Sequence, residues 1–449
     1  MTRTIASAFL CLCVATMLAR GAEPPGDEEA LWPRWRGPSD NGTASRGDPP
    51  VEWSEAKNVR WKIDIPGRGS SSPIVWGDLL FVTTAVPKGV APAAGAEDAA
   101  PPGAARRGPP SREPTSELEF VVLAVDRRDG RIRWQRTVRE GRPHAGTHAT
   151  GTWASNSAVT DGTHVFAYFG SQGLYCLDME GNLIWERDLG DMQKRREFGE
   201  GSTPVLYGEK VFIQWDHEGP SFLFALDKAT GKDVWKVSRD EISSWSTPLV
   251  VEHDAAPQIV TSATGQVAGY HADTGRLLWH TTGMTVNVIP TPVTLDGLVF
   301  AMSGFRGNAL RAIRLAGAEG DITGTDAVVW SLDRDTPYAP SPLLYEETLY
   351  FVKTNRAVLS SFDARTGKEH YGQQRLEGLG TIYSSPVGVA GRVYVTDRDG
   401  NTMVIRHGPE FAVLATNTLD DGFDASMAVV GDEILLRGQE HLYCIGRTD

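Results

Sequence analysis

A hydroxyl residue placed beside a proline recurs along most of the chain, at intervals of about 44 residues. Each copy continues with a short apolar run, a glycine turn and a strand that alternates apolar and polar residues, as in Val205–Ile213. A period of this length is typical of propellers and solenoids, in which each repeat is one small structural unit. The copies begin at Ser72, Asn156-Ser157, Thr203, Thr247, Thr291, Ser341, Ser385 and Ser426, and the second and last of them lack the proline.

The end of each copy carries a turn and a large aromatic residue. The turn resembles Asp-x-x-Thr-Gly, as in Asp227–Gly231, where the Asp side chain accepts turn hydrogen bonds and the glycine takes a positive φ. Because one blade cannot bury its sheet faces alone, an aromatic residue on each outer strand is expected to pack on the next blade. We expect this docking role for Trp61, Trp134, Trp185, Trp235, Trp279, Trp330 and Tyr371.

The two ends of the chain complement each other. The last copy, Phe423–Ile445, supplies three strands, whereas residues 58–65 around Trp61 form an outer strand with no preceding three. If these segments share one blade, the ring closes and its sheet edges are protected. The sequence therefore predicts an all-β, eight-bladed propeller over residues 58–446. Seven blades are the alternative, because the fifth and seventh copies match the repeat least well.

The N-terminal segment predicts export. Arg3, an apolar run over Ile5–Leu18 and the small residues that follow indicate a signal peptide over residues 1–22. The residues before Cys11 and Cys13 do not form a lipobox, which argues against a lipoprotein. No later segment reaches the roughly 20 apolar residues of a transmembrane span. We therefore expect a periplasmic or secreted protein.

Two further segments fall outside the repeats. Residues 23–57 are expected to form an irregular arm on the propeller surface, anchored by Trp32, Trp35 and Trp53. Residues 87–117 are rich in Ala, Pro, Gly and Arg, which predicts a disordered insertion. The net charge of −13 argues against a nucleic-acid binder, because phosphate recognition needs a basic surface.

Only Cys176 and Cys444 remain after signal cleavage. They occupy the same repeat position two blades apart, beyond the roughly 7 Å that a disulfide can span between Cα atoms. We expect both to be buried strand residues.

The tandem hairpins followed by Ala-Leu-Asp-x-x-Thr-Gly-x-x-x-Trp resemble the pyrroloquinoline-quinone-like (PQQ-like) propeller repeat over residues 58–446. This resemblance implies the fold, but it covers both quinone-dependent dehydrogenases and non-enzymatic scaffolds such as the outer-membrane protein assembly lipoprotein. The opening Trp32–Pro38 and the stretch Gly67–Pro73 resemble exported propellers of planctomycete-type bacteria.

The resemblance also implies what a dehydrogenase site would contain: a vicinal cysteine pair, calcium ligands and a catalytic Asp. The mature sequence has no vicinal cysteine pair. The segment Asp397–Asn401 reads as a tight turn and not a calcium loop, and His144 and His148 read as loop residues and not a metal pair. We therefore expect no catalytic or metal site, with PQQ and calcium as the alternative cofactors.

In a propeller, the first strands line a central channel and the loops leading into them share one mouth. The candidate ligand-binding residues at this mouth are Trp153, Asp216, His217, Trp245, Arg306, Arg356, Tyr383 and Asp424. The alternative is that these residues cap the blades and face solvent.

Three functions follow as hypotheses. The first is a monomeric, non-enzymatic binding or assembly scaffold with a protein partner in the cell envelope. The second is a PQQ-dependent oxidoreductase of alcohols or sugars. The third is a polysaccharide-binding propeller, which a channel lined with aromatic residues and paired carboxylates would favour.

Overall fold

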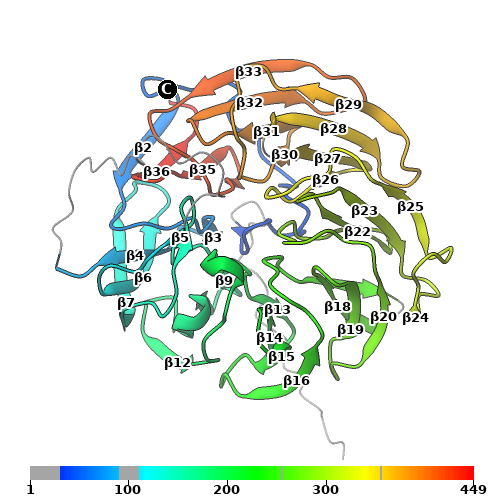
Figure 1. Cartoon of the computed structure of the whole chain (residues 1–449). Helices are drawn as coiled ribbons and strands as arrows, with labels where there is room; N and C mark the ends of the chain where they lie inside the picture. The colour runs from blue at the N-terminus through cyan, green and yellow to red at the C-terminus, as the bar shows by residue number, and fades with distance from the viewer. Residues whose placement is uncertain (1–30, 90–110, 254–255, 354–355, 449) are drawn as a thin grey trace, which may run out of the picture.

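The computed structural model describes residues 31–89, 111–253, 256–353 and 356–448. These residues form eight antiparallel sheets arranged as blades around a central axis (Figure 1). The predicted eight-bladed propeller is confirmed, and the seven-bladed alternative is wrong, because seven copies of the repeat each supply one sheet and the last copy forms the eighth together with the N-terminal strand at Val59–Asp64.

Each blade is built mainly from four strands that run in order from the channel to the rim. Blades 1 to 4 contain β3 (Ile74–Trp76), β4 (Leu79–Pro87), β6 (Leu118–Asp126) and β7 (Ile132–Gly141); β9 (Val159–Thr160), β10 (His164–Tyr168), β11 (Leu174–Asp178) and β12 (Leu183–Arg187); β13 (Val205–Tyr207), β14 (Lys210–Trp215), β15 (Ser221–Asp227) and β16 (Asp233–Arg239); and β17 (Leu249–His253), β18 (Ala256–Ser262), β19 (Val267–His271) and β20 (Leu277–Thr281).

Blades 5 to 8 follow the same order. They contain β21 (Val293–Leu295), β22 (Leu298–Ser303), β23 (Ala309–Arg314) and β25 (Val328–Leu332); β26 (Leu343–Tyr345), β27 (Thr348–Lys353), β28 (Val358–Asp363) and β29 (Glu369–Arg375); β30 (Val387–Val389), β31 (Arg392–Thr396), β32 (Asn401–Arg406) and β33 (Val413–Thr418); and β34 (Ala428–Val430), β35 (Glu433–Arg437), β36 (His441–Ile445) and β2 (Val59–Asp64).

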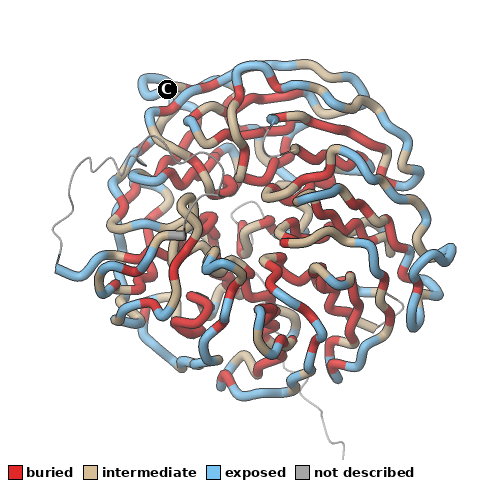
Figure 2. Tube along the Cα trace, in the orientation of Figure 1, coloured by how far each residue is buried: buried red, intermediate tan, exposed pale blue. Residues whose placement is uncertain are grey.

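The hydrophobic core lies between the blades. In Figure 2 the inner strands are mostly buried, whereas the outer strands are largely exposed. In blade 3, Val211 and Phe212 on consecutive positions of β14 are both fully buried, because each face of the sheet packs against a neighbouring blade. Such a strand is apolar on both faces, which explains the continuous apolar runs in the repeats.

The ring closes in blade 8, where the N-terminal strand β2 pairs with β36, and Trp61 lies opposite Cys444. Cys444 and Cys176 are free and fully buried. Burial raises the pKa of both thiols to about 12. As expected, both cysteines are buried strand residues, Cys176 in β11 and Cys444 in β36.

Five tryptophans dock their blades on the next one with the same geometry. The indole N–H of each donates to a backbone carbonyl in the third-to-fourth-strand turn of the following blade, over 2.7 to 3.0 Å. The glycine of that turn lies against the ring, and a Cβ at Gly231 would stand 2.6 Å from Trp185. The donor and acceptor pairs are Trp61 to Arg127, Trp134 to Met179, Trp185 to Lys228, Trp235 to Ala272 and Trp330 to Ala364.

Trp279 and Tyr371 differ from this pattern. Trp279 is fully buried, but its indole N–H donates to Gln258 Oε1 within its own blade. The following blade has replaced its tight turn with an excursion whose strand β24 (Gly320–Asp321) pairs in parallel with β20. Tyr371 packs edge-on against Phe411 of the next blade, with ring centroids 5.7 Å apart.

The segments outside the repeats are described in part. The predicted signal peptide over 1–22 lies outside the described residues, as does most of the 87–117 insertion. At the ends of that insertion, Pro87 pairs with Leu118, and β5 (Ser111–Arg112) pairs with β8 (Thr147–His148). Within the described part of the chain, no helix is long and apolar enough to cross a membrane.

The N-terminal arm crosses one end of the channel. Its strand β1 (Leu31–Trp32) adds to the channel side of blade 1, and the following residues pass the centre of the ring in Figure 1. Asn41 exchanges two hydrogen bonds with the backbone of Thr294 in blade 5, and Ala44 donates to Gly388 O in blade 7. Trp32 and Trp53 are buried. The arm therefore connects inner strands from opposite sides of the ring.

Candidate functional site

The recurring hydroxyl residues form a closed belt around the channel, which we call the hydroxyl ring. In each blade, the backbone N–H of this residue donates to the hydroxyl oxygen of the equivalent residue in the next blade, over 2.8 to 3.3 Å. All eight residues are at least 95% buried. The members are Ser72, Ser157, Thr203, Thr247, Thr291, Ser341, Ser385 and Ser426.

The channel itself is a cavity of about 590 Å³, including space open to solvent, with the hydroxyl ring in its wall. Three candidates from the sequence line it: Trp245, Tyr383 and Asp424. Trp35 of the arm lines it too. Its lining combines the hydroxyl groups of the ring with the aromatic side chains of Trp35, Trp245 and Tyr383.

The charge of Asp424 is balanced at the channel wall. Both of its carboxylate oxygens accept hydrogen bonds from Arg398, and the guanidinium of Arg398 lies over the Tyr383 ring, 4.5 Å from its centroid. An ion pair held against an aromatic face keeps both groups in fixed positions.

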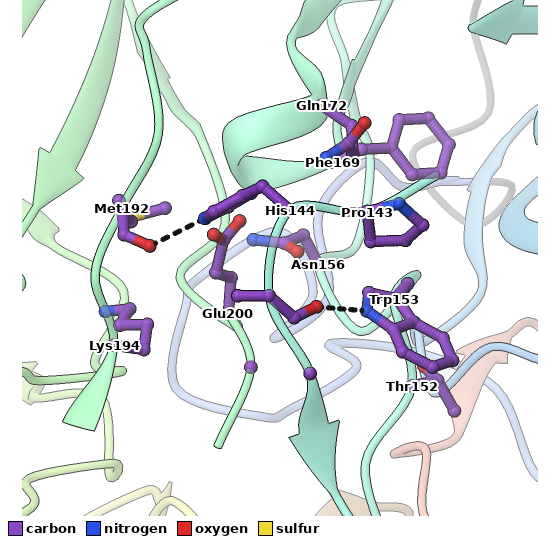
Figure 3. A pocket seen from close by; sticks show the side chains of 13 residues that line it. Pro143, His144, Thr152, Trp153, Asn156, Phe169, Gln172, Met192, Lys194 and Glu200 are labelled. Carbon is purple, nitrogen blue, oxygen red and sulfur yellow. Dashed lines mark hydrogen bonds between the residues drawn. The ribbon is translucent and has the colours of Figure 1, made fainter. Parts of the chain in front are cut away.

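A second cavity, the side pocket, encloses about 410 Å³ beside the channel (Figure 3). Its lining includes Trp153, His144, Lys194 and Glu200. The indole N–H of Trp153 donates to Ala145 O at 3.0 Å, and a His144 ring nitrogen lies 3.0 Å from Met192 O. Figure 3 shows Glu200 and His144 next to each other. Burial raises the pKa of Glu200, although its bonds with Ser171 oppose this.

Lys194 connects the side pocket with the channel wall. Its ammonium donates to the carbonyl oxygens of Asp216 and Ser244, at 2.6 and 2.7 Å, and lies 5.1 Å from the centroid of Trp245. Burial lowers the pKa of Lys194 to about 8. Its contacts are therefore with neutral carbonyls and an aromatic face that borders the channel.

Asp216 and His217 serve the loop structure. Asp216 forms a fully buried ion pair with Arg239 and accepts further hydrogen bonds from Gln214 and Ser244. A ring nitrogen of His217 accepts the Gln193 N–H at 3.0 Å, and the other lies 2.9 Å from Pro220 O. Burial lowers the pKa of His217, which fits a neutral ring that bonds to the backbone on both sides.

Arg306 and Arg356 are exposed at the loops between second and third strands. Arg306 adopts a φ of +54° and lies 5.4 Å from the ring centroid of Phe305. Phe305 in turn stacks on Tyr338, from the connection to blade 6, with centroids 4.8 Å apart. We call Phe305, Arg306 and Tyr338 the rim cluster.

The structure thus divides the predicted channel-mouth residues. It brings Trp245, Tyr383 and Asp424 together in the channel, but places Trp153 in the side pocket, Asp216 and His217 inside loops, and both arginines at the surface. The sequence predicted Trp35 only as an anchor of the arm and did not indicate that it lines the channel. It also did not indicate that the recurring hydroxyl residues form a ring. The presence of Ser or Thr in all eight copies was the signal that could have revealed the ring.

The channel does not fit the calcium ion of a quinone enzyme. Its described lining contains a single carboxylate, that of Asp424, and Arg398 holds both of its oxygens. Cys176 and Cys444 are buried in strands of different blades, so they do not supply a vicinal pair. Among the residues that the structure describes, no three His, Cys, Asp or Glu side chains are grouped to hold a metal.

A closed ring of eight antiparallel blades with recurring indole docking defines this chain as a PQQ-like β-propeller repeat protein. The sequence matches the family described as "Outer membrane protein assembly factor BamB" over residues 42–213, 118–282 and 221–449, and the chain belongs to that family. No curated protein matches the sequence.

Solved structures share the fold at low sequence identity. BamB from Moraxella catarrhalis is 14% identical with a TM-score of 0.57, over 87% of this chain and 99% of that chain. A europium-containing methanol dehydrogenase is 10% identical with a TM-score of 0.61, over 93% and 98%. The quinohemoprotein alcohol dehydrogenase from Comamonas testosteroni is 10% identical with a TM-score of 0.60, over 94% and 81%. Similarity at this level concerns the fold alone.

Proposed function

We propose that this protein is a non-enzymatic binding or assembly scaffold that presents the rim of a rigid propeller to a protein partner in the periplasm or cell envelope. The observation that carries the proposal is the rim cluster. Arginine and aromatic side chains are enriched among the residues that contribute most to protein–protein affinity. Here they stand together at one edge of blade 5, with Arg306 exposed.

The rim cluster is held in place before any partner arrives. Stacking of Phe305 on Tyr338 joins a loop of blade 5 to the connection toward blade 6. Thr336, two residues before Tyr338, donates its hydroxyl to Ser303 O at 2.7 Å and fixes that connection. A surface ordered in advance loses little side-chain entropy on binding, which favours affinity.

The polar groups near the channel support the same proposal. Asp424, Asp216 and Lys194 each have structural partners. A general acid or base needs access to the substrate proton, and these groups are committed to loop and blade contacts instead. The family description, which names outer membrane protein assembly, agrees with a scaffold.

Site-specific photo-crosslinking tests the proposal. A photoreactive residue at position 306 is expected to crosslink one discrete envelope protein in the cells that produce this chain. The matched control is the same residue at Lys232, an exposed turn position of blade 3 that follows Gly231. Equal crosslinking from both positions, or none from position 306, would contradict a binding role for this rim.

An activity assay separates the scaffold from an oxidoreductase of the same fold. The mature protein, loaded with calcium and titrated with PQQ, is expected to show no one-to-one uptake and no dye reduction with alcohols or sugars. Stoichiometric uptake with turnover would overturn the scaffold proposal.

A further inference from the structure

The hydroxyl ring carries eight hydroxyl protons for which the described part of the chain provides no acceptor. Each oxygen of the ring accepts one backbone N–H, and a Ser or Thr hydroxyl also has one O–H to donate. Within the described residues, none of these eight O–H groups donates to a protein atom, although all eight residues line the channel cavity. One level of the channel therefore presents a concentration of hydrogen-bond donors.

Two arginines are buried next to residues of the hydroxyl ring, and within the described residues neither donates a hydrogen bond to a carboxylate. Arg437 donates to the hydroxyl and carbonyl of Ser71, the residue before Ser72 of the ring, and to Thr83 O. Arg36 donates to the carbonyls of Pro342 and Pro386, the residues after Ser341 and Ser385 of the ring. Both arginines are 1% exposed. Burial alone shifts the pKa of Arg437, whereas the Asp40 carboxylate, which forms an ion pair with Arg34, is near enough to Arg36 to oppose the effect of burial on its pKa.

Such an arrangement is costly unless a negative charge lies nearby. The guanidinium of Arg437 bonds only to neutral oxygens, so it has lost its hydration without gaining a counterion, and that of Arg36 has only Asp40, whose carboxylate also pairs with Arg34. The cost is visible in the pKa of both arginines, which burial lowers to about 9. The ammonium of Lys194 lies 5.1 Å from the ring centroid of Trp245, which lines the channel, and the carboxylates of Glu200, Asp216 and Glu218 oppose the lowering of its pKa by burial.

The one carboxylate in the described channel lining does not neutralise these buried cations. Asp424 is neutralised by Arg398, which binds both of its oxygens. The whole chain carries a net charge of −13, so the buried cations near the hydroxyl ring are a local feature of this part of the molecule.

We propose that the channel binds a small oxyanion, which accepts hydrogen bonds from the hydroxyl ring while the charges of Arg36 and Arg437 stabilise it from behind. Ser and Thr hydroxyls suit this ligand because they donate to its oxygens without bringing a further charge. The proposal is independent of the rim cluster, which lies outside the channel lining.

Calorimetric titration of the mature protein with inorganic phosphate tests the site, at constant ionic strength with sodium chloride as the balancing salt. Saturable binding of phosphate is expected, with one ion per chain. Sulfate is the second probe, and competition between the two would show that the site selects oxyanions in general. No saturable binding of either anion would overturn the proposal.

Two variants connect the binding to the ring. The double substitution Thr247→Val and Thr291→Val keeps the side-chain shape but removes two donors, and is expected to weaken phosphate binding about tenfold or more. It also removes the acceptors of the Thr203 and Thr247 N–H groups, so its control must be a variant that is destabilised elsewhere. Gly231→Ala is the matched control, because it disturbs blade docking away from the channel and is expected to leave the affinity unchanged. An unchanged affinity in the double variant would also overturn the proposal.

Asp424→Asn is expected to change the phosphate affinity in the opposite direction, which loss of stability alone would not do. It removes the negative charge that Arg398 balances, so phosphate affinity is expected to rise several-fold. A fall in affinity would contradict the electrostatic part of the argument. Crosslinking from position 306 is expected to be the same in all three variants, so the two proposals fail separately.

Discussion

Ser426 donates its backbone N–H to the hydroxyl oxygen of Ser72 over 3.0 Å, and this bond joins residues 354 positions apart. It completes the hydroxyl ring between the last blade and the first. The same relationship occurs between every pair of neighbouring blades, so each blade positions the inner strand of the next.

Ser72→Ala is expected to destabilise the propeller by about 1 to 3 kcal/mol, because it leaves the buried N–H of Ser426 without an acceptor. Chemical denaturation of the variant and the parent protein measures this change. Ser246→Ala is the control, since Ser246 is equally buried but its hydroxyl only donates to carbonyl oxygens. A larger loss at Ser246 than at Ser72 would contradict the role given to the ring.

Gly231→Ala is expected to cost more stability than Gly208→Ala. Both glycines have positive φ, +68° and +54°, so both substitutions carry a backbone cost of about 1 to 2 kcal/mol. Only the Cβ at Gly231 meets the Trp185 ring, at 2.6 Å, which adds about 1 to 3 kcal/mol, whereas nothing lies within 4 Å of a Cβ at Gly208. Equal denaturation midpoints for the two variants would show that the docking contact has no effect.

Arg239→Met is expected to destabilise the protein by about 3 to 5 kcal/mol, because it leaves the buried carboxylate of Asp216 without its counterion. Arg239 also donates to Thr261 and Tyr270 of blade 4, so the loss falls on the contact between blades 3 and 4. Adding Asp216→Leu to this variant is expected to restore part of the stability. If the double variant lost more free energy of unfolding than the two single variants lose together, this account would be contradicted.

The buried carboxyl group of Glu241 is expected to make the stability of the protein depend on pH. Burial raises the pKa of its carboxyl to about 7, above the ordinary value of 4.5, so the folded protein holds a proton that the unfolded chain releases between these pH values. The stability contributed by the protonated form is therefore present below pH 4.5 and is lost as the pH rises toward 7, by up to about 3 kcal/mol.

The variant Glu241→Gln isolates this effect. It does not titrate, and its single side-chain oxygen can replace one of the two carboxylate oxygens that accept the N–H groups of Gly265 and Gln266. Between pH 5 and 8, the free energy of unfolding is expected to change less with pH for the variant than for the parent protein. If the free energy of unfolding changed equally with pH in both proteins, another titratable group would be the cause of the pH dependence.

The sequence by itself determined the blade, because its signals are local. The hairpin turns, the apolar strands and the Asp-to-Gly turn of Asp227–Gly231 lie within a few residues of one another. The recurring tryptophans indicated docking, and the unmatched strand around Trp61 indicated how the ring closes. The number of blades followed from counting copies of this unit.

Only the tertiary structure decided which side chains meet. The partners of Asp424, Arg437 and Arg36 come from other blades or from the arm, and no short motif records them. Trp279 shows the same limit, because an excursion more than 35 residues later changed its environment. The physical reason is that ring closure brings together residues far apart in the chain, so the composition of the channel depends on the register of all eight blades at once.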